Sequence, residues 1–327
     1  MKKFKTNSMI KATTTTLAAC LLMACGGDDD SSSTDQTPAQ TSFTYTTESH
    51  TFTVSLPEMG ATVGKSVFSV NVQDDTGSAI ANLTPTMTPM MNMAAGHQHS
   101  APHTGCTETD VDGNAECTSY FLMPSEMNGV TMGDWSLGFS LSEGSETISF
   151  APVVKMAMGD TALAKLKGDD NDQIPAMAMQ EMTMHSMAMD SMEMEVQTEA
   201  RTYFIFNNSI MTMGDNSSVE LFLAAKESMM SFPTLTQNLV LNADSANELT
   251  IDTLQVQVSS DNATWVNASS QGEGIWKATE ITGLTDTLYV SLSINGETKT
   301  TNGQITGDEN SAAIFTLAND EMSSMDM

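Results

Sequence analysis

The stretch WSLGFSL at residues 135–141 decides the fold. Apolar side chains occupy every second position in it, and a period of two is typical of a β-strand with one buried face. Residues 67–72, VFSVNV, follow a similar pattern, and the turn-forming sequence DDTG comes soon after at 74–77. Apolar strands separated by such turns predict antiparallel sheets.

Short apolar segments of this kind extend over most of the chain. Short strands at fairly regular spacing, without long helical periodicity, are typical of β-sandwiches. A length of 327 residues is enough for two such domains. Further candidate strands lie at 51–56, 203–206, 219–223, 254–258 and 288–294.

The predicted class is therefore all-β, with two immunoglobulin-like β-sandwich domains. We place the first at 43–152 and the second at 199–318. Between them, residues 153–198 are acidic and rich in methionine, with few aromatic or β-branched residues to build a core, so we expect a mobile linker. Residues 319–327 form a short Met-rich tail.

The N-terminus resembles the leader of a bacterial lipoprotein. Positively charged residues at the start precede a short apolar run that ends in Leu22-Met23-Ala24-Cys25. Small residues before a cysteine at this distance resemble the lipobox, in which the cysteine is acylated and becomes the first residue of the mature chain. We expect a signal peptide at 1–24, lipidation of Cys25 and a flexible tether at 25–42. An ordinary secretory signal peptide is the alternative.

Two further observations bear on this anchor. A second lipobox-like match ends at Cys20, but cleavage there would leave LLMAC at the start of the soluble chain. Gly26, and not aspartate, follows Cys25, so we expect the outer membrane of the cell envelope. Several acyl chains hold a protein stably at a bilayer. Outside the leader, no stretch approaches the eighteen apolar residues of a membrane-spanning helix.

The chain is strongly acidic. Its formal net charge is −29, and loss of the leader's Lys2, Lys3, Lys5 and Lys11 would make it −33. Such a surface repels nucleic acid, because binding to phosphates depends on lysine and arginine. It attracts cations and would raise their local concentration. Solubility in a salty medium explains the same charge equally well, so charge alone assigns no function.

Two cysteines remain outside the leader, Cys106 and Cys117. They flank Asp110-Val111-Asp112-Gly113, a predicted four-residue hairpin loop in which Gly113 can take a positive φ. In that register the two cysteines lie opposite each other, and outside the cytoplasm such a pair predicts a disulfide. A copper-binding thiol pair is the alternative. An EF-hand calcium loop counted from Asp110 would need glutamate where Phe121 stands.

Residues 177–194, MAMQEMTMHSMAMDSMEM, repeat Met-x-Met every five positions. A five-residue step matches neither the period of a strand nor that of a helix, so the methionines line no single core face. Thioethers are soft ligands that prefer Cu(I), and by the same argument Ag(I), to harder metals. The predicted ligands are Met177, Met179, Met182, Met184, Met187, Met189, Met192 and Met194, with His185 among them.

A second candidate metal site lies in TMTPMMNMAAGHQHSAPH at 86–103, which we expect to be a loop. Imidazole nitrogens suit Cu(II), and neighbouring thioethers suit Cu(I). Three histidines would also suit zinc, but zinc gains little from thioethers. An accidental surface composition is the alternative without metal. The predicted ligands are Met87, Met90, Met91, Met93, His97, His99 and His103.

Several of these features together resemble the YtkA-like family over about 65–142. The resemblance is carried by an alternating strand before Asp75-Thr76-Gly77, the Met- and His-bearing segment, the DVDGN hairpin and MGDWSL at 132–137. Members are immunoglobulin-like bacterial domains linked to copper handling and oxidase assembly, so the resemblance implies that fold and a role with copper. The cysteine pair is not matched to the family, and the resemblance supports fold more than function.

Motifs for catalysis are lacking in the sequence, and we predict no enzyme. There is no nucleophile elbow, phosphate-binding glycine loop or H-E-x-x-H. A blue-copper centre would need a free cysteine. We expect an envelope lipoprotein that binds copper or silver, for sequestration or for transfer to or from another envelope protein. The alternatives are a surface lipoprotein whose methionines absorb oxidants and a purely structural or adhesive lipoprotein.

Overall fold

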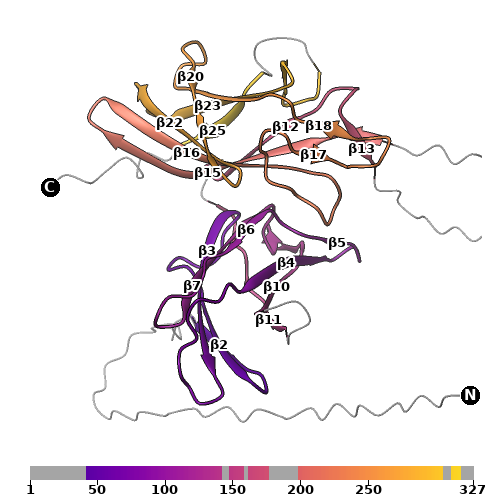
Figure 1. Ribbon diagram of the computed structural model, residues 1–327. Helices are drawn as coiled ribbons and strands as arrows, with labels where there is room; N and C mark the ends of the chain where they lie inside the picture. The colour runs from indigo at the N-terminus through magenta and orange to yellow at the C-terminus, as the bar shows by residue number, and fades with distance from the viewer. Residues whose placement is uncertain (1–41, 142–146, 158–160, 177–197, 305–310, 318–327) are drawn as a thin grey trace, which may run out of the picture. The chain divides into compact units, whose positions relative to one another are not determined.

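The computed structural model of the chain describes residues 42–141, 147–157, 161–176, 198–304 and 311–317. All regular secondary structure in these ranges is β-strand, which confirms the predicted all-β class (Figure 1). Within the same ranges, no helix is long and apolar enough to cross a membrane.

The first β-sandwich consists of two antiparallel sheets, drawn in indigo to magenta in Figure 1. One sheet has the order β1-β2-β3-β7-β6, with β1 Ser42–Thr46, β2 His50–Ser55, β3 Gly64–Asp74, β7 Asn114–Phe121 and β6 His103–Cys106. The other has the order β11-β10-β4-β5, with β11 Ile148–Phe150, β10 Gly133–Ser140, β4 Thr86–Met93 and β5 Gln98–His99. A small hairpin pairs β8 Glu126–Met127 with β9 Val130–Thr131.

Alternating side chains of both sheets build the core of this sandwich. Phe68 and Val70 of β3 share one buried cluster with Trp135 and Leu137 of β10. Burying a large apolar side chain contributes about 1.5–3 kcal/mol, so the alternation seen at 135–141 fixes which face of β10 turns inward. A slip of one residue would bring the serines into the core and expose the tryptophan.

The second β-sandwich has the same construction. One sheet has the order β12-β15-β16-β22-β21, with β12 Leu163–Lys167, β15 Thr202–Met213, β16 Asn216–Ala225, β22 Ile275–Thr282 and β21 Ser269–Gly272. The other runs β20-β19-β23-β24, with β25 also paired to β23; the bounds are β20 Val266–Asn267, β19 Leu254–Ser259, β23 Thr287–Ile294, β24 Glu297–Thr298 and β25 Ala313–Thr316. A separate short pair joins β17 Val240–Leu241 to β18 Leu249–Thr250.

Two apolar clusters involve this second sandwich. Its main core includes Leu221 of β16, Trp276 of β22 and Val290 of β23. A smaller cluster combines Tyr120 of β7 with rings of β15 and β16. Tyr120 and Phe222 stack there with their ring centroids 3.8 Å apart. The side chain of Tyr120 therefore leaves the first core and packs on aromatic residues of the second sandwich.

Part of the stretch predicted as a linker belongs to the sandwiches. Val154 is buried in the first core, and β12 pairs in register with β15, with Leu166 opposite Tyr203. In sequence, β12 reads LAKLK, in which only Leu166 is fully buried. A single buried residue between lysines gives no alternation long enough to predict a strand, so the sequence analysis placed it in the linker.

Candidate metal centre

The predicted His/Met loop at 86–103 is largely strand. Residues Thr86–Met93 form β4, in which Met87 and Met91 point inward and are 1% and 0% exposed. Both belong to the apolar core of the first sandwich. The expectation of a surface loop at 86–93 was wrong, because Met87 and Met91 alternate with threonine and asparagine at the period of a strand. Because the segment contains four methionines, the alternation was not recognised in the sequence.

The other methionines of β4 and the first histidine lie nearer the surface. Met90 and Met93 are half-buried, and His97 is exposed. A tight turn after β4 holds His97, since Met93 N–H donates to the His97 carbonyl oxygen at 2.8 Å. His97 is therefore exposed to solvent in the turn between β4 and β5, and its backbone lies across that turn from Met93.

His99 is the buried histidine of the segment, with 3% of its surface exposed. It lies in β5 directly opposite Met91. Its Nδ1 contacts the carbonyl oxygen of Ser100 at 2.8 Å, and its Nε2 lies 3.2 Å from the Met123 sulfur. Burial is the main cause that lowers the pKa of His99, and the charge of Lys226 lowers it further against the effect of the Ser100 contact. The ring is therefore neutral at pH 7.

Trp135 contacts both His99 and the backbone of Met123. The rings of His99 and Trp135 meet edge to face with centroids 5.2 Å apart. Trp135 Nε1–H donates to the backbone carbonyl oxygen of Met123 at 3.0 Å. One tryptophan thus positions both the histidine ring and the backbone that carries the thioether.

Met123 was missed by the sequence analysis. It follows β7, twenty-four positions after His99, and stands alone in the stretch Leu122-Met123-Pro124. No spacing motif links it to His99, because the contact is made between segments from different sheets. Only the strand order brings the two residues together.

The three histidines do not form one group. His103 begins β6, which belongs to the other sheet of the sandwich, and its side chain is exposed. It lines a shallow hollow together with Ser100, Met230 and Phe232. Across the described ranges, no three side chains of histidine, cysteine, aspartate or glutamate are close enough to hold a metal ion. His97, His99 and His103 therefore lie in three different places in the structure: the turn after β4, β5 and β6.

The Met-x-Met tract at 177–194 lies outside the described residues, as do Cys25 and the tail at 319–327. The segments that flank the tract are described. Strand β13 Gln173–Pro175 pairs antiparallel with β14 Thr198–Ala200, with Pro175 opposite Thr198. The chain thus enters and leaves the tract at neighbouring positions of one small sheet.

A buried charged cluster lies beside this small sheet. Asp172 accepts a hydrogen bond from Arg201 Nε at 2.7 Å and forms an ion pair with Lys299 Nζ at 3.1 Å. Tyr203 Oη–H also donates to Asp172, and burial followed by the charge of Asp172 raises the pKa of that tyrosine. Asp172 precedes β13 and Arg201 follows β14, so the cluster ties both ends of the tract to the second sandwich.

One further Met-x-Met pair is described. Met211 and Met213 stand at the end of β15 beside the turn to β16, with exposures of 56% and 82%. Residues two apart on a strand project to the same face. The two thioethers therefore share one solvent-facing side of the hairpin.

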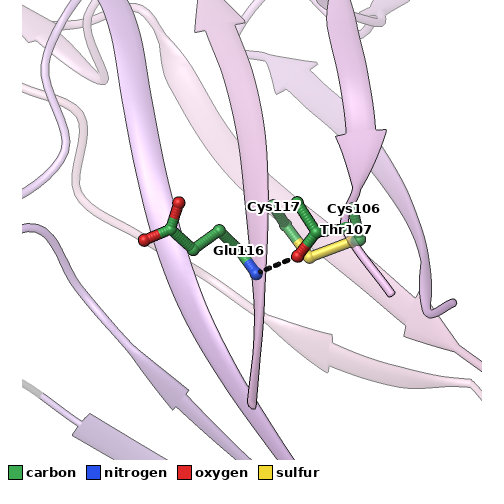
Figure 2. Close-up of a disulfide and its surroundings, with 4 residues drawn as sticks. All are labelled: Cys106, Thr107, Glu116 and Cys117. Carbon is green, nitrogen blue, oxygen red and sulfur yellow. Dashed lines mark hydrogen bonds between the residues drawn. A yellow bond between two sulfur atoms is a disulfide. The ribbon is translucent and has the colours of Figure 1, made fainter. Parts of the chain in front are cut away.

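The predicted disulfide is confirmed. Cys106 and Cys117 are bonded (Figure 2) and stand directly opposite each other in β6 and β7. The backbone N–H of Glu116 donates to Thr107 Oγ1 at 2.9 Å beside the bond. The hairpin loop at Asp110–Gly113 closes as predicted, with Gly113 at φ 79°. Both thiols are therefore used in a covalent bond and not as metal ligands.

The chain is only weakly similar to known proteins. Neither a protein-family model nor a curated protein matches the chain. Solved structures similar to it include the Escherichia coli adhesin FdeC (12% identity, TM-score 0.23, covering 82% of this chain and 64% of that chain) and Yersinia pseudotuberculosis InvD (12%, 0.23, 81% and 57%). Domains 5–6 of the S-layer protein SbsC match at 11% identity and TM-score 0.21, covering 79% and 94%. The chain spans less than two thirds of FdeC and InvD, and the likeness is one of fold alone.

Proposed function

We propose that this chain is an envelope lipoprotein that binds Cu(I), or Ag(I), through thioether groups, either to sequester the metal or to exchange it with another envelope protein. The observation that carries the proposal is the Met-x-Met tract at 177–194, whose five-residue period serves no core face. Soft thioether sulfur selects soft monovalent ions. Cys25 would supply the membrane anchor, and the strongly acidic surface would concentrate cations near the chain.

Features of the described residues support this proposal. The paired strands β13 and β14 flank the tract, so the described residues on its two sides are neighbours in one small sheet. Met211 and Met213 offer another exposed pair of thioethers on β15. Because neutral sulfur ligands do not titrate, metal held by them should remain bound in mild acid.

The test is an anaerobic Cu(I) titration of the mature protein against a competing chelator, followed by metal analysis. A variant in which all eight tract methionines are leucine is the main comparison, since leucine keeps size and removes sulfur. A His185→Ala variant is the control for the tract's one imidazole. The proposal requires the leucine variant to lose most of its Cu(I) capacity while its circular dichroism is unchanged. Full retention of capacity would overturn the assignment to the tract.

A second candidate function is an oxidant sink. Met59, Met127, Met156, Met211, Met213 and Met230 have strongly exposed side chains. Exposed methionine oxidises to a sulfoxide that reductases restore. Mass spectrometry after graded peroxide exposure would measure this capacity. Uniform oxidation of exposed methionines that Ag(I) does not slow would favour the sink, whereas protection of the tract by Ag(I) would favour metal binding.

A further inference from the structure

In the first sandwich, the Nε2 atom of His99 faces the sulfur atom of Met123. The Ser100 carbonyl oxygen can only accept a hydrogen bond, so its 2.8 Å contact requires a proton on His99 Nδ1. A neutral imidazole then carries a lone pair on Nε2. That lone pair faces the thioether sulfur of Met123 at 3.2 Å. No hydrogen lies between the two atoms, and both are soft enough to bind the same metal ion.

The alternative to a metal site is an imidazolium whose Nε2–H donates to sulfur. His99 is 3% exposed, and burial opposes the charged form of its ring. Among the described residues, the partners of the two ring nitrogens are the Ser100 oxygen and the Met123 sulfur, and neither is a carboxylate. A buried cation without a counter-charge is costly. The neutral ring with an available Nε2 is therefore the state that the surroundings favour.

The residues around the pair complete a small soft-metal site. Strand order β10-β4-β5 places Met91 directly between Trp135 and His99, and all three side chains are buried on the same face. Met91 is thus a third candidate ligand. An indole face can also attract a cation. Met123 is half-buried, so an ion can approach from its side.

We propose that His99 Nε2 and Met123 Sδ form a preformed site for one Cu(I) or Ag(I) ion, with Met91 as the third ligand and Trp135 as an aromatic wall. For comparison, zinc bonds are about 2.0 Å to nitrogen and about 2.3 Å to sulfur, and bonds of that order would let one ion reach both atoms across 3.2 Å. This deepens the proposed function, on which it rests for the kind of metal. It adds a site that does not depend on the Met-x-Met tract.

The test uses Ag(I), which needs no reductant, on the full mature chain carrying the eight tract leucines. Methionines are labelled with ¹³C at the methyl group, and the Met123 signal is assigned from a Met123→Leu variant. Addition of Ag(I) should shift the Met123 signal and quench tryptophan emission at one ion per chain. Met123→Leu should weaken this binding roughly 10–100-fold or more, as loss of a partner at a metal site does.

Met90→Leu is the matched control, because Met90 neighbours Met91 in β4 but projects to the other face. It should bind Ag(I) like its parent. An unmoved Met123 signal, or equal affinities of the Met123→Leu and Met90→Leu variants, overturns the site. If the wild-type chain binds Ag(I) and the tract-leucine chain binds none, the proposed function stands and this inference falls. If the tract-leucine chain keeps one ion that Met123→Leu removes, the inference holds whatever the tract contributes.

Discussion

Pro175 and Thr198 lie directly opposite each other in the antiparallel pair of β13 and β14. The Met-x-Met tract is therefore inserted at one place in the second sandwich, and β12 already belongs to that sandwich before the tract begins. Because the entropy of closing a loop depends only weakly on its length, the number of residues between Pro175 and Thr198 should have little effect on the stability of the domain.

Replacing residues 177–197 by a short Gly/Ser linker should leave the fold intact. Each halving of loop length is expected to stabilise by about 0.6 kcal/mol, so the free energy of unfolding should stay the same or rise slightly. Urea denaturation followed by tryptophan fluorescence measures this. The matched control is Ile174→Asp, which puts a charge at a buried position of β13 and should destabilise the protein. A loss of stability in the linker variant as large as that of the control would contradict the prediction.

The ion cluster beside the tract should contribute strongly to stability. Arg201→Met leaves Asp172 buried without its closest cation, and breaking a buried pair in this way costs about 3–5 kcal/mol. The control is Lys226→Met, because the Lys226–Glu199 pair is partly exposed and such pairs contribute about 0–1 kcal/mol. Guanidinium denaturation of both variants gives the comparison. Equal small losses would show that Asp172 is satisfied without Arg201.

The disulfide should stabilise the first sandwich by restricting its unfolded state. The bond closes a loop with a sequence separation of 11, for which chain entropy predicts about 2–3 kcal/mol. A Cys106→Ala/Cys117→Ala variant should lose that amount in urea denaturation while keeping its Ag(I) affinity. Mass spectrometry of the non-reduced wild type should show the linked peptides. If the variant instead lost Ag(I) binding and kept the stability of the wild type, the two cysteines would be metal ligands.

Local patterns predicted much of the fold. The alternation at 135–141 predicted β10 and its inward face, and the DVDG turn predicted the hairpin that brings Cys106 to Cys117. Both features depend on residues close in sequence. The same reasoning failed at β4, where a period-two pattern was read as a cluster of ligands because Met87 and Met91 are both apolar and metal-binding by type.

The His99 contacts could not have been predicted in this way. His99 reaches Met123 only because β5 and the segment after β7 come from facing sheets. Sequence spacing reports neighbours along a strand or a turn, whereas this contact is set by how two sheets pack. Asp172 and Arg201 illustrate the same limit, since they meet across the base of the tract.

The metal-free protein should lose stability in mild acid because of His99. Burial lowers the pKa of this ring below the ordinary value for histidine, which is roughly 6.5. Above that value the ring is neutral in both folded and unfolded chains, so pH has no effect through His99. As the pH falls from roughly 6.5 toward the folded pKa, the unfolded chain takes up a proton that the folded chain does not. Stability is therefore lost across that window, by up to about 1.4 kcal/mol per pH unit.

The measurement is urea denaturation at a series of pH values from roughly 8 to 5, the range in which histidine titrates. A His99→Phe variant should show a shallower fall than wild type, because phenylalanine keeps a buried ring and binds no proton. His103 is exposed by surface area, but the hollow that it lines surrounds its ring with protein atoms, and this desolvation lowers its pKa. A His103→Gln variant therefore identifies its share of the slope. If His99→Phe and wild type lost stability in parallel, His99 would take up its proton equally in the folded and unfolded chains, and burial would not keep its ring neutral in acid.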